Sequence, residues 1–192
     1  MRCVRWDELF ADLEAQLDAQ EAADLAGEVA DRTRRERALV ELADRLVAAQ
    51  GRVLAAQLVG GTTVEGVVAD VAQQWLVLHG PQGPALVPVA AVVGVLGLGS
   101  AAATTGRDAV RRRISLAAAL RAVARDRSPV RVGLADGSVV TGTLDAVGAD
   151  HADLAEHPVD EPRRPGAVRG VRTLPFAALA WVRPAPGSST LA

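Results

Sequence analysis

The sequence predicts an α+β protein made of two small five-stranded β-barrels in tandem, each preceded by a helix, with a long helix at the N-terminus. Three observations support this fold class. Apolar residues recur at helical spacing over residues 7–49 and again over 109–126. Short apolar runs bounded by glycine and proline follow each helical segment. The two sets of runs also resemble each other at a fixed spacing, which indicates an internal duplication.

The first helical segment covers residues 7–49, where Asp7 can cap the start and Gly51 ends the helix. Gly27 weakens its middle, and the charged run 31–36 has a spacing that could begin a new helix. We therefore expect a continuous or gently broken helix, with a bent pair of helices as the alternative.

The start of this helix carries an apolar stripe that is too long for one small barrel to cover. We expect the stripe to pack against a partner helix, either in another protein or in a second copy of the chain. The candidate residues of this face are Leu9, Phe10, Leu13 and Leu17.

The strand-like runs form two sets with matching landmarks. Gly61 and Gly66 bracket four residues in the first set, and Gly137 and Gly142 do the same 76 residues later. The closing segments match at an offset of 87 residues, so the second copy has 11 extra residues, in the loop 157–170. The expected strands are 53–58, 63–71, 75–78 and 85–89 in the first copy, and 130–134, 139–147, 152–154 and 171–182 in the second.

These boundaries divide the chain into five parts. The predicted parts are an N-terminal helical segment (1–50), a first barrel (51–98), a linker (99–108), a helix plus a second barrel (109–183) and a disordered tail (184–192).

The second strand set, residues 130–154, follows the pattern of an apolar strand, Gly-x4-Gly, then apolar-x2-apolar. This pattern resembles the first motif of Sm-like proteins, whose fold is a small barrel of the SH3-like kind. The resemblance implies two tandem Sm-like barrels. Sm-like RNA binders place an Asp and an Asn after the second strand, where this chain has Gly148 and Ala152 in one copy and Ala72 and Leu76 in the other. The resemblance therefore implies the fold without the uridine pocket.

The composition excludes several classes of enzyme. The chain has no Lys, so it cannot build a P-loop, a protein kinase site or a pyridoxal Schiff base. Cys3, the only cysteine, cannot form an internal disulfide or a CxxC metal site, which favours a reducing cytoplasm. No apolar run approaches the ~20 residues of a membrane span. The Arg- and Ala-rich composition and the opening 6–10 resemble actinobacterial proteins of unassigned function.

Arginine is the most conspicuous candidate for chemistry. The net charge is −2, but residues 97–192 contain 13 Arg against nine acidic residues. If these arginines converge on one surface, they could hold several phosphates. The candidate residues for nucleic-acid binding are Arg111, Arg112, Arg113, Arg121, Arg125, Arg127, Arg163, Arg164, Arg169 and Arg172.

His151, Asp153 and His157 alternate in a way that could place metal ligands on one face, but a solvated polar turn is the favoured interpretation. We expect no catalytic residue, metal or cofactor. The sequence thus predicts a cytoplasmic, non-enzymatic regulatory or scaffolding protein that acts through protein–protein interaction and forms a homo-oligomer. The alternative is an RNA- or DNA-binding regulator that uses the Arg-rich second helix and the loop 157–170.

Overall fold

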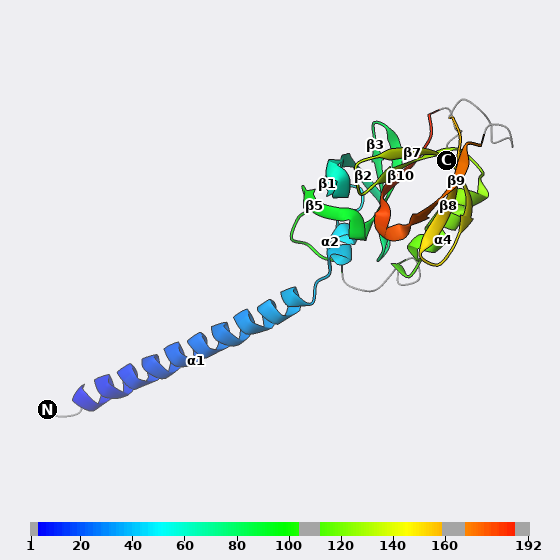
Figure 1. Cartoon of the computed structure of the whole chain (residues 1–192). Helices are drawn as coiled ribbons and strands as arrows, with labels where there is room; N and C mark the ends of the chain where they lie inside the picture. The colour runs from blue at the N-terminus through cyan, green and yellow to red at the C-terminus, as the bar shows by residue number, and fades with distance from the viewer. Residues whose placement is uncertain (1–3, 104–111, 159–167, 187–192) are drawn as a thin grey trace. The chain divides into compact units, whose positions relative to one another are not determined.

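The computed structural model describes residues 4–103, 112–158 and 168–186 (Figure 1). The chain divides into two compact units, the first ending at Glu41 and the second beginning at Leu42. None of the helices in the described part of the chain combines the length and apolar character that a membrane span requires.

The first unit consists of helix α1, Val4–Ala38. The helix runs without interruption through Gly27 and through the charged run 31–36, where Arg32 and Glu36 form an ion pair of 3.1 Å. Its end is tightened by a hydrogen bond from the Leu39 amide to the Glu36 carbonyl, 3.2 Å. Helix α2, Leu42–Ala48, belongs to the second unit. The predicted helical segment is therefore two helices that separate at residues 39–41.

The second unit contains ten strands in two consecutive sets. The first set is β1 (Val53–Leu58), β2 (Thr63–Val71), β3 (Trp75–Gly80), β4 (Gly83–Pro88) and β5 (Val92–Leu96). The second set is β6 (Val130–Leu134), β7 (Val139–Val147), β8 (His151–Glu156), β9 (Gly170–Pro175) and β10 (Leu179–Pro184). One-turn 3-10 helices join β1 to β2 (Val59–Gly61), β4 to β5 (Val89–Ala91) and β9 to β10 (Phe176–Ala178).

Helix α4, Leu116–Arg125, precedes the second set of strands. The Ser115 hydroxyl caps it by accepting a hydrogen bond from the Ala118 amide at 3.2 Å. Leu120 is fully buried on the face that packs against the second set. The helix thus begins later than the predicted residue 109, and residues 104–111 lie outside the described part.

The prediction of two separate five-stranded barrels is wrong. The ten strands form one open antiparallel sheet in the order β5-β1-β2-β3-β4-β10-β6-β7-β8-β9. A barrel would require β4 to close on β5 within one half. Instead, β5 lies beside β1, and the outer edge of β4 pairs with β10 through Leu86 and Val182. Because β10 satisfies this edge, the first half joins the second and does not close on itself.

The two halves nevertheless repeat one strand order, β5-β1-β2-β3-β4 and β10-β6-β7-β8-β9. Corresponding strands keep the offsets of 76 and 87 residues seen in the sequence. Strand β2 ends at Val71 and its counterpart β7 at Val147, whereas β4 ends at Pro88 and its counterpart β9 at Pro175. The extra residues of the second half fall between β8 and β9.

The halves also share their hydrophobic cores. The core of the first half contains Leu46 of α2 and Trp181 of β10. The core of the second half contains Leu120 of α4 together with Trp75 and Leu86 from the first half. Each half therefore contributes a tryptophan to the core of the other, and neither core is complete without both sets of strands.

Candidate functional site

The structure describes seven of the ten candidate arginines, and Arg111, Arg163 and Arg164 lie outside the described residues. Three of the seven pair with a carboxylate. These pairs are Arg112 with Asp44 of α2, Arg127 with Asp145 of β7, and Arg172 with Glu156 of β8. Both side chains of the Arg112–Asp44 pair are largely buried, so this pair joins α2 to the start of the second half.

A fourth arginine, Arg121 on α4, donates hydrogen bonds to the carbonyl oxygens of Val147 and Gly148, at 3.3 and 3.0 Å. The remaining three, Arg113, Arg125 and Arg169, are exposed. Four of the seven described candidates thus make hydrogen bonds within the protein, and three of these four are paired with a carboxylate.

The predicted partner-helix face lies on α1. Phe10, Leu13 and Leu17 are all exposed there, and the side chain of Leu9 lies outside the described part of the structure. Leu25 and Val29 are exposed further along the helix, so apolar side chains occur on more than one stretch of α1.

The histidine cluster is dispersed. The His151 Nδ1 lies 2.8 Å from the Asp150 Oδ1, and this hydrogen bond lowers the pKa of Asp150. His157 is 3% exposed, with its Nδ1 2.8 Å from the Pro158 carbonyl oxygen and its Nε2 2.8 Å from the Thr143 Oγ1. A carbonyl oxygen only accepts, so Nδ1 carries the proton and, in the neutral ring, Nε2 accepts from the Thr143 hydroxyl. Both ring nitrogens are occupied, and His157 is not free to bind a metal.

The two outermost strands of the sheet are β5 and β9. Within the described ranges, β5 pairs only with β1, and β9 pairs only with β8. Both strands carry exposed apolar side chains, because Val93 is 71% exposed, Leu96 60% and Val171 62%. An edge of this kind presents unpaired amide and carbonyl groups beside apolar surface, which is a template for another strand.

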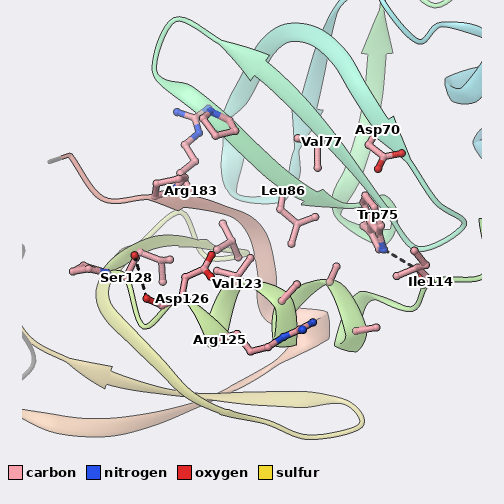
Figure 2. A pocket seen from close by; sticks show the side chains of 18 residues that line it. Asp70, Trp75, Val77, Leu86, Ile114, Val123, Arg125, Asp126, Ser128 and Arg183 are labelled. Carbon is pink, nitrogen blue, oxygen red and sulfur yellow. Dashed lines mark hydrogen bonds between the residues drawn. The ribbon is translucent and has the colours of Figure 1, made fainter. Parts of the chain in front are cut away.

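A pocket of about 680 Å³ lies between α4 and the strands β3, β4 and β10 (Figure 2). Its walls are mainly apolar and include Val77, Leu86 and Val123. The indole nitrogen of Trp75 already donates to the Ile114 carbonyl oxygen at 3.0 Å, so it is not free for a ligand. The pocket can hold an apolar group, and its lining also includes polar side chains, among them Asp70, Asp126 and Arg183.

Sequence reasoning missed one cationic cluster, which lies where β10 joins the two halves. Arg183 and Arg131 are paired residues of β10 and β6, and both guanidinium groups lie over the ring of Trp181. Neither arginine is among the ten candidates predicted from the sequence. The sequence does contain a signal for part of this cluster. Trp181 and Arg183 are two residues apart on one strand, so their side chains lie on the same face of the sheet.

Comparison with known proteins gives no match of significance to a family model, to a curated protein or to a solved structure.

Proposed function

We propose that this protein is a non-enzymatic scaffolding module that self-associates by pairing strand β9 of one copy with strand β5 of the next. The observation that carries the proposal is the internal pairing of β4 with β10. That junction is an example, within one chain, of the contact that two free edges could make between chains.

The repeat identifies which edges correspond. At the offset of 87 residues, β9 is the counterpart of β4, and β5 is the counterpart of β10. Leu86 pairs with Val182 at the internal junction. The corresponding residues are Thr173 on β9 and Val95 on β5. An intermolecular junction of the same register would place Thr173 of one copy opposite Val95 of the next.

The antiparallel register then fixes the neighbouring pair, Arg172 opposite Leu96. Residues directly opposite each other across two strands have side chains in contact range. Leu96 is exposed and lies on β5, whereas Arg172 is held on β9 by Glu156 of the adjacent strand. The charge at position 96 should therefore control the strength of the contact.

The main competing function is nucleic-acid binding through the arginines. Four of the candidate arginines already donate hydrogen bonds to acceptors within the protein, and this observation favours the scaffolding proposal. They are Arg112, Arg121, Arg127 and Arg172. The absence of Lys and of a nucleophile motif in the sequence supports a non-enzymatic role.

The first test is light scattering of the full chain after size-exclusion chromatography, over a wide range of concentration. Wild type should form species larger than a monomer. Leu96→Arg faces Arg172 with a like charge and should weaken assembly, whereas Leu96→Glu should not, with about a tenfold difference in dissociation constant between the two variants. Val53→Arg is the matched control, since Val53 is 59% exposed on the interior strand β1. A monomeric wild type, or equal assembly by both Leu96 variants, would contradict the proposal.

A cross-linking test separates edge pairing from helix pairing. Two chains are made in a Cys3→Ser background, one with Leu96→Cys and the other with Arg172→Cys. Under mild oxidation, a disulfide-linked dimer should form efficiently only when the two are mixed, because the proposed contact joins unlike edges. Efficient dimerisation of either variant alone would indicate a symmetric contact instead, and assembly without any cross-link would show that these edges are not in the contact and would contradict the proposal.

A further inference from the structure

The cationic cluster of Arg131, Trp181 and Arg183 has an unusual geometry. The Cζ atom of Arg183 lies 4.9 Å from the centroid of the Trp181 ring, and that of Arg131 lies 5.8 Å from it. The indole lies over Gly133, where a Cβ atom would come within 2.2 Å of its nitrogen. Gly133 therefore makes room for the ring, and the two arginines reach it from the paired positions of β10 and β6.

The hydrogen bonds of Arg183 are incompletely satisfied. One terminal nitrogen donates to the Gln82 side-chain oxygen, and the buried Nε has no hydrogen-bond partner. Desolvation, followed by the positive charge of Arg131, lowers the pKa of Arg183. Among the described residues, neither arginine forms an ion pair, in contrast to Arg112 and Arg172.

Like charges directly opposite each other on neighbouring strands destabilise a sheet. Partial burial makes the repulsion stronger, because less water screens it. Contact with the face of Trp181 offsets part of this cost for each cation but does not neutralise either charge. The cluster therefore has two positive charges, unused N–H donors and no anion from the described protein.

We propose that Arg131 and Arg183 together bind a small phosphate-type oxyanion at the junction of the two halves. Two guanidinium groups carry two positive charges, which a phosphate dianion balances and a single carboxylate does not. The planar donors of guanidinium also match the oxygens of phosphate in bidentate geometry. The ligand is inorganic phosphate or the phosphate group of a small monoester.

The burial of Trp181 separates this ligand class from nucleic acid. Trp181 is only 5% exposed, so it offers no face on which a base could stack. Without stacking, a nucleic acid would have to bind through its phosphates alone. The site is also remote in the strand order from β5 and β9, so this inference goes beyond the scaffolding proposal and does not depend on it.

The test is calorimetric titration of the full chain with inorganic phosphate and with a small phosphate monoester, in chloride buffer of matched ionic strength. Wild type should bind one phosphate group per chain. Arg131→Gln and Arg183→Gln should each weaken binding by at least about tenfold, because each removes one charged donor set. Arg113→Gln, which alters an exposed arginine outside the cluster, should bind as wild type does.

Thermal unfolding provides a second measurement on the same proteins. Phosphate should raise the Tm of wild type above that in matched chloride, because it binds only the folded state, and the rise should disappear in the two cluster variants. Each variant removes a repulsion and also a contact with the Trp181 ring, so the phosphate effect is measured against the Tm of the same variant in chloride. An equal phosphate effect in all variants would mean a general salt effect and would overturn the proposal.

Two other results would also overturn the proposal. One is the lack of phosphate binding by wild type at millimolar concentration. The other is binding of single-stranded RNA that depends on Arg131 but is not competed by phosphate, which would assign the cluster to nucleic acid. Assembly is measured separately by light scattering, so failure of the scaffolding proposal would leave this result unchanged.

Discussion

Replacing Gly142 with alanine should strongly destabilise the sheet. Gly142 lies within β7, where it pairs with Val130 on one side and Glu156 on the other. A Cβ atom at this position would lie 2.0 Å from the Ala155 carbonyl oxygen, 2.8 Å from its carbon and 3.1 Å from the Glu156 Cα. All three are backbone atoms of β8, so no side chain can rotate to relieve the clash.

The size of the effect follows from what must move. Overpacking in a well-packed region costs about 1–3 kcal/mol. Displacing β8 would also lengthen one or two ladder hydrogen bonds, each contributing about 0.5–1.5 kcal/mol. The expected loss in the free energy of unfolding is therefore about 3 kcal/mol. With a urea slope of about 2 kcal/mol per molar, the unfolding midpoint should fall by about 1.5 M.

The assay is urea unfolding followed by tryptophan fluorescence, since Trp75 and Trp181 report on the two shared cores. Gly170→Ala is the matched control, because a Cβ atom at Gly170 meets nothing within 4 Å. That variant should stay within about 0.5 kcal/mol of wild type. The repeat extends the prediction to Gly66→Ala, whose Cβ would lie 2.6 Å from the His79 carbonyl. Equal midpoints for the Gly142 and Gly170 variants would refute the reasoning.

Two further predictions concern hydrogen bonds to ionisable side chains. Thr143→Val should lower the free energy of unfolding by about 1–3 kcal/mol, because the buried His157 Nε2 loses its donor, and Thr143→Ser should retain most of the stability in the same urea assay. The Asp136 carboxylate accepts hydrogen bonds from the Ser138 hydroxyl (2.6 Å) and amide (2.8 Å), which lower the pKa of Asp136 from its ordinary value. In an NMR titration Ser138→Ala should raise that pKa toward the ordinary value. A lowered pKa stabilises the fold above the unfolded-state pKa, and this stabilisation is lost as the pH falls through the folded-state value.

Most of the strands could be predicted from the sequence because their signal is local. The exceptions are β5, which is not among the predicted runs, and the predicted run 171–182, which a 3-10 helix divides into β9 and β10. The alternation of apolar residues over 63–71 corresponds to β2, Thr63–Val71, and the counterpart run corresponds to β7. The pairing of Leu86 with Val182 has no such signal, since the two residues lie far apart in the chain. Each strand set taken alone predicts a closed barrel. In the structure the edge of β4 pairs with β10, and this pairing makes one sheet of the two sets.

The site could be predicted only in part, for a related reason. The density of arginines along the sequence predicts a cationic region around α4. It does not indicate which carboxylates the fold places next to these arginines. Asp44 reaches Arg112 from α2, and Glu156 reaches Arg172 from the neighbouring strand β8. Arg183 lies alone among apolar residues in the sequence, and only the pairing of β10 with β6 places it beside Arg131.

The strand order also constrains what kind of assembly is possible. Each half has two kinds of edge, one on the β4 or β9 side and one on the β5 or β10 side. The internal junction uses one edge of each kind, β4 and β10, and therefore leaves one of each kind, β9 and β5. Pairing of like edges, such as β9 with β9, would give a contact with two-fold symmetry. Unlike edges pair head to tail, which leaves one β5 edge and one β9 edge free at the two ends of every open oligomer. Self-association through these strands must therefore either close into a ring of fixed size or continue as a filament. A mass that stays constant with rising concentration would indicate a ring, and a mass that keeps rising would indicate a filament.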